Sequence, residues 1–365
     1  MGRGKHLGSL GILMLRRESD GPWLGWPYES VLKNAGVELY HIPEDTPLDA
    51  DIFRLLAFCP ERPSLIFRPE CTHFPRPAGL TEVDIPTAIE EVDVYAYTHR
   101  RIGWSMLFDY PVIYHPGFAK VFEAAGHPRP IELPQALKRE LYPRQERARE
   151  FEVGWVGKVD GAIYRARRPV LTELAQHFKM NDWQRHYSQD EMAEIYLRSK
   201  IVVNVSRDDY PQDANRRVFE ALGAGALLVT RMPTELTDIG LEEGVHFAGY
   251  REAAELVPLV QKYLDDDALR CRVAQAGRAE VLRNHTYENR VETLLRVLRE
   301  DAGRLWAPAR SWPAHRVDLA YLDYYAGNGP LALAKREWPR VARSSAGGAV
   351  RGAVLIAGAW SRRWR

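Results

Sequence analysis

Two arginines occupy an unusual place in the segment NRRVFEALGAGALLVT at residues 215–230. Asn215 is a good helix N-cap, because its side-chain oxygen can accept a hydrogen bond from a free backbone N–H, and the apolar residues after it have helical spacing. Arg216 and Arg217 then fall in the first turn, where the helix dipole already places about half a positive charge. Two cations are unfavourable there unless an anion binds beside them. Guanidinium groups hold phosphate oxygens in a bidentate fashion, so this helix start predicts a phosphate site.

Glu220 follows Arg216 by one helical turn on the same face. It could form only an ion pair with Arg216, worth about 0.3–0.5 kcal/mol on an exposed helix. It could also accept hydrogen bonds from the ribose of a nucleotide whose phosphates lie at the helix start. The glycines of GAGA at 223–226 then end the helix, because glycine adopts the left-handed backbone of a C′ residue without strain.

A second candidate phosphate loop is GWVGKVDG at 154–161. Gly157 would let the backbone approach a ligand, and Lys158 would add a point charge. The loop is neither a GxGxxG fingerprint nor a P-loop, so a plain strand-to-helix turn is an equal alternative.

The composition indicates a globular protein of two domains. The chain has 365 residues, 45% of them hydrophobic and 27% charged, with a formal net charge of +1, which gives no reason to expect nucleic acid. Cys59, Cys71 and Cys271 are scattered and lack CxxC spacing, which argues against a disulfide framework or a zinc site and favours a reducing cytoplasm. No stretch has the ~20 apolar residues of a transmembrane helix, and we expect LGILML at 10–15 to be a buried strand rather than part of a signal peptide.

Short apolar runs alternate with helical patterns, which is typical of βαβ units and parallel sheets. The expected strands lie at 9–15, 37–41, 64–68, 85–89 and 111–115, and then at 151–157, 200–206, 226–230 and 245–250. Three helices are expected between 251 and 303. We therefore predict an α/β protein with two doubly wound domains, at 1–137 and 151–303. A charged linker at 138–150 would join them, and 304–365 would be a carboxyl-terminal extension.

The last stretch, SSAGGAVRGAVLIAGAWSRRWR, combines small and apolar residues with arginines and tryptophans. One interpretation is a basic amphipathic anchor on anionic lipid, with Trp360 and Trp364 at the interface. The other is a terminal helix packed on a domain, or a frayed end.

The segment 199–250, which contains RVFEALGAGALLVT, and the later AGRAEVLRNHTYENRVETLL resemble the carboxyl-terminal domain of GT-B glycosyltransferases. They are most similar to the spore maturation protein CgeB family, a glycosyltransferase family 1/4-like group. SLIFRPECTHFP and DIPTAIEEVDVYAYTH in the first half are similar to phrases of the same group. The resemblance implies two Rossmann-like domains facing a central cleft, with the nucleotide sugar on the second domain and the acceptor on the first.

The resemblance also implies a donor site for a UDP-, GDP- or dTDP-sugar. Glu220 would hold the ribose, and the turn RHYS at 185–188, with Tyr187, would contact the base. Asn215, Arg216 and Arg217 would lie near the diphosphate, and Lys158 would approach it from the loop that contains Gly157. Arg207 is a further donor-binding candidate. GT-B enzymes generally need no metal or other cofactor, because basic side chains and helix dipoles stabilise the leaving diphosphate.

One position departs from the family pattern. Many retaining members carry a glutamate eight residues before the ribose-binding one, and here that residue is Gln212. If the transfer is inverting, it needs a general base from a loop after a strand of the first domain. The candidates are Asp93, His73 and His115, with His99 a weaker one.

The predicted function is therefore a glycosyltransferase of the hexosyltransferase kind, cytoplasmic or peripheral at the inner membrane face. Its acceptor could be a glycan, a protein, a lipid or a small molecule. A sugar-nucleotide epimerase or hydrolase on the same scaffold, or a protein that binds nucleotide sugars without turnover, are alternatives. A nicotinamide dehydrogenase is disfavoured because no GxGxxG follows a strand.

Overall fold

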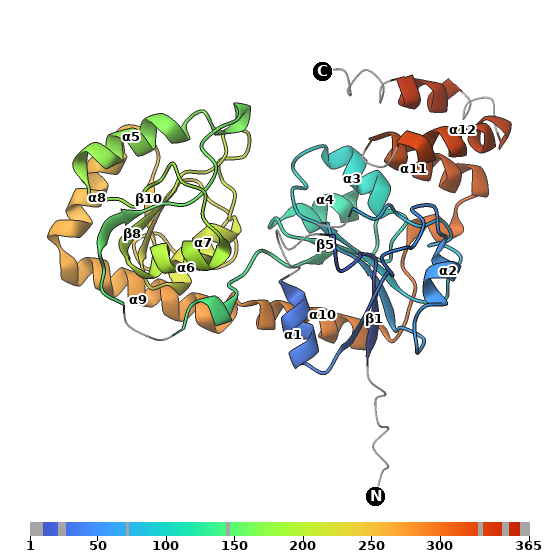
Figure 1. The fold of residues 1–365 in the computed structure, drawn as a ribbon, viewed down its shortest axis with the longest axis horizontal. Helices are drawn as coiled ribbons and strands as arrows, with labels where there is room; N and C mark the ends of the chain where they lie inside the picture. The colour runs from blue at the N-terminus through green and yellow to red at the C-terminus, as the bar shows by residue number, and fades with distance from the viewer. Residues whose placement is uncertain are drawn as a thin grey trace, which may run out of the picture. The chain divides into compact units, whose positions relative to one another are not determined.

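The computed structural model describes residues 10–20, 27–70, 73–143, 147–327, 331–344 and 350–357. The chain divides into two compact units, each built around its own parallel sheet (Figure 1). The first unit combines residues 1–132 with 294–365, and the second comprises 133–293.

The first unit contains a six-stranded parallel sheet with the order β2-β1-β3-β4-β5-β6. Its strands are β1 (Gly11–Met14), β2 (Glu38–His41), β3 (Leu65–Arg68), β4 (Thr87–Glu91), β5 (Tyr110–Ile113) and β6 (Ile131–Glu132). Its intervening helices are α1 (Tyr28–Asn34), α2 (Ile52–Leu56), α3 (Thr98–Ser105) and α4 (Phe118–Ala124). β1, β3, β4 and β5 are buried throughout, as expected for parallel strands covered on both faces. The five predicted strands all occur, and β6 is an addition.

The second unit contains a four-stranded parallel sheet with the order β10-β9-β8-β7. Its strands are β7 (Phe151–Gly154), β8 (Ser199–Asn204), β9 (Leu227–Arg231) and β10 (Ala248–Tyr250). Its helices are α5 (Arg167–His177), α6 (Gln189–Leu197), α7 (Arg216–Gly223), α8 (Leu256–Asp265) and α9 (Asp267–Asn284). Along β8, Ile201 and Val203 join one hydrophobic cluster and Val202 joins another, so both faces of the sheet are packed.

The boundaries between the units differ from the expected ones. The charged segment 138–150 lies within the second unit, where Arg149 donates hydrogen bonds to five backbone carbonyls, among them Ser199 O and Gly225 O at 2.9 Å each. α10 (Tyr287–Asp301) carries the chain from the second unit back into the first. The expected boundary at 303 thus lies beyond the observed one, which falls inside a continuous helix.

The segment after 303 is part of the first unit rather than a separate extension. α11 (Ala314–Gly327) lies beside α3 and α12 (Leu331–Ser344) lies beside α11 in Figure 1, and both contribute to the hydrophobic core that contains Trp104 of α3. On α11, Tyr321 donates to Pro77 O at 2.9 Å and Tyr325 donates to Arg76 O at 2.7 Å. Buried tyrosines that satisfy loop carbonyls explain why this segment docks.

The described part of the tail is helical at 350–357, and its Leu355 and Ile356 pack against the core of the first unit. Val350 and Val354 on the same helix are exposed. Trp360 and Trp364 lie outside the described residues. Among the helices of the described ranges, none has the length and apolar character needed to cross a membrane.

Candidate functional site

The start of α7 has the predicted geometry. Asn215 has an extended backbone, and its side chain accepts a hydrogen bond from Arg217 N at 3.2 Å. The helix begins at Arg216 and ends at Gly223, and Gly225 follows with a φ of +68°. Both the N-cap and the left-handed glycine at the helix end are therefore confirmed.

Glu220 is fully buried, with 0% of its surface exposed. Its Oε1 lies 3.1 Å from Arg216 Nε, but the guanidinium is not aligned for a hydrogen bond. Neither carboxylate oxygen accepts a hydrogen bond from any residue in the described ranges. Burial raises the pKa of Glu220, and the positive charges of Arg216 and Arg217 oppose that rise. A buried acceptor that receives no hydrogen bond is costly, so this carboxylate is suited to receive donors from a ligand.

Arg217 brings the two predicted phosphate segments together. A Cβ atom at Gly157 would lie 3.1 Å from Arg217 Nη1, so the guanidinium lies directly over that glycine. Arg217 Nε is buried and makes no hydrogen bond within the described chain. Lys158 is exposed in the same loop. The Arg217 N–H thus lies beside the start of α7, where an anion is favoured, and Lys158 follows the glycine that Arg217 covers.

Arg167, at the start of α5, was not singled out from the sequence. Its side chain is buried and donates from Nε to Val205 O at 3.0 Å and from Nη1 to Lys158 O at 2.7 Å. It also stacks 4.1 Å from the ring centre of Tyr164. Burial, and after it the charge of Arg217, lower the pKa of Arg167 to about 9. Arg167 therefore joins the loops that follow β7 and β8 and adds positive charge beside Arg217.

Arg207 follows β8 and pairs with its neighbour Asp209, at 2.9 Å from Nε and 2.7 Å from Nη2. Tyr187 is half-buried before α6, and its hydroxyl donates to Asp182 O at 2.9 Å. Both residues lie in loops after the strands of the second sheet or before its helices. Their predicted contacts with the donor stay predictions.

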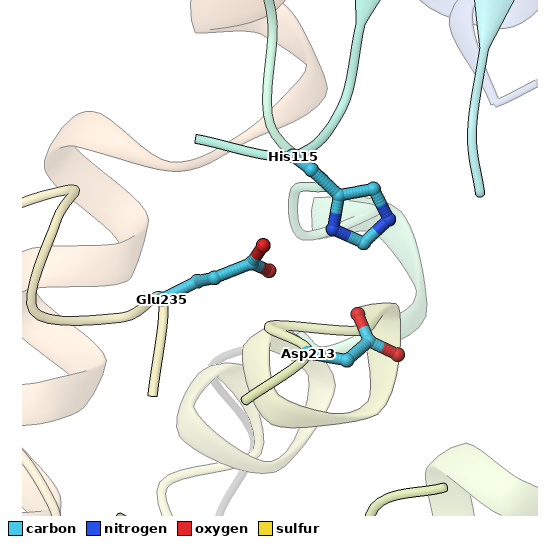
Figure 2. Close-up of side chains that lie close together, drawn as sticks. All are labelled: His115, Asp213 and Glu235. Carbon is cyan, nitrogen blue, oxygen red and sulfur yellow. The ribbon is translucent and has the colours of Figure 1, made fainter. Parts of the chain in front are cut away.

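The loop that precedes α7 is fixed by Glu235, which is buried after β9. Its carboxylate accepts hydrogen bonds from Ala214 N at 2.9 Å and from the Tyr210 hydroxyl at 2.7 Å. Its own N–H donates to Gln212 O at 2.9 Å. Figure 2 draws Glu235 and Asp213 of this region together with His115, which belongs to the first unit. Gln212 therefore lies in a loop that is held by hydrogen bonds to Glu235.

The base candidates of the first unit differ in their surroundings. His115 is buried just after β5, with its ring edge-on to Tyr95 at 5.1 Å between centres. Asp93 is half-buried in the loop after β4. The side chain of His73 is 84% exposed and lies 3.7 Å from Asp20 Oδ1. His99 is exposed on α3.

An ionic network at the ends of β3 and β4 was also missed. Arg101 pairs with Glu70 at 2.8 Å and with Glu91 at 2.7 Å, and Ser105 donates to Glu91 at 2.7 Å. Burial raises the pKa of Glu91, while Arg101 opposes that rise. Arg101 also donates to Ala96 O at 3.1 Å, so the network fixes the loop that carries Asp93. Only the run of two glutamates at the end of a predicted strand signalled it.

The comparisons with known proteins agree with this architecture. A family model described as glycosyl transferase-like matches residues 143–296. A comparison with curated protein sequences gave no match. Among solved structures, HepE from Anabaena in complex with UDP and glucose is 12% identical, with a TM-score of 0.58 over 80% of this chain and 100% of that one.

Two further structures are similar. Sucrose-phosphate synthase from Thermosynechococcus elongatus is 12% identical, with a TM-score of 0.57 over 80% of this chain and 99% of that one. The UDP-forming α,α-trehalose-phosphate synthase from Burkholderia vietnamiensis is 11% identical, with a TM-score of 0.54 over 84% and 100%. These likenesses confirm the predicted GT-B fold with its two parallel-sheet α/β domains. They do not test the narrower resemblance to the CgeB family, which stays a prediction.

Proposed function

We propose that this protein is a glycosyltransferase that takes a sugar from a nucleoside-diphosphate donor bound by the second unit. The observation that carries this proposal is Glu220, a fully buried carboxylate without a hydrogen bond from the described chain, one turn behind a helix start that holds two arginines. An anion at the helix start and a polyol one turn further along would satisfy both features. A nucleoside diphosphate offers these two groups at adjacent positions.

In this proposal the diphosphate binds at the N-terminus of α7, where the helix dipole favours an anion, with Arg216, Arg217 and Lys158 around it. Its negative charge increases as the bond to the sugar breaks, so the same cations stabilise the transition state more than the bound donor. The ribose hydroxyls donate to Glu220, and a hydrogen bond to a charged acceptor contributes about 1.5–3 kcal/mol. These groups supply the stabilisation that a metal ion provides elsewhere, so we propose a metal-independent transfer.

The similar structures support this choice of donor. HepE was solved with UDP and glucose and with UDP-glucose, and the trehalose-phosphate synthase is UDP-forming. We therefore propose a hexosyl donor and test uridine nucleotides first. The narrower CgeB-like assignment rests on the sequence resemblance alone.

We further propose that the first unit supplies the general base for the acceptor hydroxyl. His115 and Asp93 are better held than His73, because their side chains are buried or half-buried after strands of the sheet. Replacing the base should lower the transfer rate by about 10²- to 10⁴-fold and leave donor binding unchanged. Single alanine variants of the three residues would identify it.

The proposal is tested by thermal shift with UDP, GDP, dTDP and NAD, followed by turnover assays with the sugar nucleotides that match the ligands found. A nucleotide at a hundred times its Kd stabilises by about 2.7 kcal/mol. We expect stabilisation by at least one nucleoside diphosphate and release of that diphosphate when an acceptor is present. Stabilisation by NAD alone would refute the proposal, and binding without turnover would favour a non-catalytic nucleotide-sugar protein.

A further inference from the structure

A buried tyrosine belongs to the surroundings of Glu220. Tyr142 is 2% exposed, and its hydroxyl makes no hydrogen bond within the described ranges. It joins the hydrophobic cluster that contains Val218 and Phe219 of α7. It lies in the charged segment that the sequence marked as a linker, so no local pattern pointed to it.

Tyr142 shares its hydrophobic cluster with Val218, Phe219 and Ala221, the residues on either side of Glu220 in α7. Burial, and after it the negative charge of Glu220, raise the pKa of Tyr142. Three polar atoms in one buried neighbourhood therefore have no hydrogen bond from the described chain: Oε1 and Oε2 of Glu220 and the hydroxyl of Tyr142. Each such group costs about as much as a lost hydrogen bond when it is buried.

The hydrogen-bonding capacities of these atoms define what can satisfy all three. An ionised carboxylate only accepts, whereas a tyrosine hydroxyl has one hydrogen to donate. Tyr142 can therefore serve at most one carboxylate oxygen. A vicinal diol brings two further O–H donors, one for each oxygen of Glu220, and its own oxygens can accept from Tyr142. The 2′- and 3′-hydroxyls of a ribose form such a diol, and a 2′-deoxyribose does not.

We propose that Tyr142 and Glu220 together select ribonucleotides over 2′-deoxyribonucleotides, with Tyr142 donating to one of the two ribose hydroxyls. This inference rests on the proposed function, and it narrows the donor to the UDP or GDP type and excludes dTDP. A site built to bond two hydroxyls rejects a ligand that lacks one, because a buried acceptor is then left unpaired. Tyr142 acts here as a specificity residue of the donor site.

The experiment measures the affinities of UDP, 2′-deoxy-UDP and 3′-deoxy-UDP by titration calorimetry, with GDP and 2′-deoxy-GDP in parallel. The wild-type protein is compared with Tyr142→Phe. The matched control is Tyr110→Phe, because Tyr110 lies in the first unit and is also a buried tyrosine whose hydroxyl makes no hydrogen bond within the described ranges. Melting temperatures of all three proteins show that the folds are intact.

We expect the wild type to bind UDP or GDP at least 10-fold more tightly than its 2′-deoxy form. Tyr142→Phe should weaken the ribonucleotide by about 3- to 10-fold and reduce the discrimination against one deoxy analogue, the one whose missing hydroxyl Tyr142 contacts. Tyr110→Phe should show the same ratio of ribonucleotide affinity to deoxyribonucleotide affinity as the wild type. This pattern would support the inference.

Equal affinity for ribo- and 2′-deoxyribonucleotides in the wild type would overturn the selectivity. If Tyr142→Phe discriminates against both deoxy analogues as strongly as the wild type does, Tyr142 only packs in the core, and its proposed hydrogen bond to the ribose is refuted. If no nucleoside diphosphate binds at all, the proposed function itself fails, and the inference fails with it. The first two results leave donor binding intact, so they are distinguishable from the third.

Discussion

Replacing Glu220 by glutamine separates a ligand-binding role from a structural one. The substitution removes the charge and keeps the size of a side chain that is fully buried and has no aligned hydrogen bond from the described chain. If the carboxylate were the structural partner of Arg216, breaking a buried pair would cost about 3–5 kcal/mol. If its partners are ribose hydroxyls, the unliganded protein loses little, and we expect the free energy of unfolding to change by less than about 1 kcal/mol.

The effect on donor binding should be large. Glutamine keeps one acceptor oxygen, so one hydrogen bond to a charged group is lost, at about 1.5–3 kcal/mol. That corresponds to a roughly 10- to 150-fold weaker affinity for UDP, or for whichever nucleoside diphosphate the wild type binds. Calorimetric titration and melting curves of the same two proteins measure both quantities. We expect an unchanged melting temperature together with a weaker affinity for the nucleotide.

The pH dependence of stability provides an independent test of the role of Glu220. The pKa of Glu220 is raised by burial in the folded protein, above the unfolded value of about 4.3. Between these two pKa values the folded state binds more protons than the unfolded state, so the free energy of unfolding falls as pH rises. Glu220→Gln lacks this contribution, and wild type minus variant stability should therefore be larger at pH 5 than at pH 8. Donor affinity, which needs the ionised carboxylate, should change in the opposite direction.

Two results would refute this reasoning. One is a variant that loses several kcal/mol of stability and binds the nucleotide normally, since Glu220 would then be a structural residue. The other is a stability difference between wild type and variant that does not change with pH, because the buried carboxylate would then not titrate as its surroundings require.

Three further predictions concern other parts of the molecule. Asp109 pairs with Arg310 at 2.8 Å, and although burial acts to raise the pKa of Asp109, Arg310 holds it below the usual value. Asp109→Asn should therefore lower the free energy of unfolding by about 3–5 kcal/mol in chemical denaturation. The wild type should lose the same contribution only as the pH falls through that lowered pKa. Tyr97 is 71% exposed with a left-handed φ of 60°, so Tyr97→Asn should stabilise by about 1 kcal/mol, seen as a melting temperature higher by a few degrees. Arg167→Lys keeps the charge but loses the fork to Val205 O and Lys158 O, so it should weaken UDP binding more than uridine binding in titrations.

Each of these has a contrary outcome. If Asp109→Asn leaves the free energy of unfolding unchanged, the carboxyl-terminal segment docks without this ion pair. If Tyr97→Asn lowers the melting temperature, the tyrosine ring itself holds the loop. If Arg167→Lys weakens the binding of UDP and of uridine equally, Arg167 maintains the loop conformation and does not act on the phosphates.

The sequence predicted what depends on local rules. The alternation of apolar runs located nine strands, and Asn215 with the glycines after 222 located both ends of α7, because capping and periodicity act over a few residues. Glu220 was reached in the same way, from helical spacing.

What it could not predict depends on contacts between distant residues. Arg167 is one of three arginines at 165–168, and nothing in their spacing shows which one is buried. Tyr142 and Arg149 lie in a segment whose charge indicates a linker, yet packing against α7 and hydrogen bonds to distant carbonyls place both in the second unit. The docking of 304–344 has the same character, because it depends on tyrosines that reach loop carbonyls some 240 residues earlier.

The two arginines at the start of α7 are not equivalent, and the structure predicts which one binds the diphosphate more strongly. Arg216 lies against the carboxylate of Glu220 at 3.1 Å, whereas Arg217 lies over Gly157 and its charge acts on the buried guanidinium of Arg167. The uncompensated positive charge is therefore on the side of Arg217. We expect Arg217→Ala to weaken UDP by about 10- to 150-fold with uridine little changed. Arg216→Ala should weaken the binding of UDP and uridine alike, because it removes the first of the two positive charges that oppose the rise in the pKa of Glu220 and so raises the cost of ionising the group that holds the ribose. Titration of both ligands against both variants decides the matter, and the opposite order would place the phosphates beside Arg216 instead.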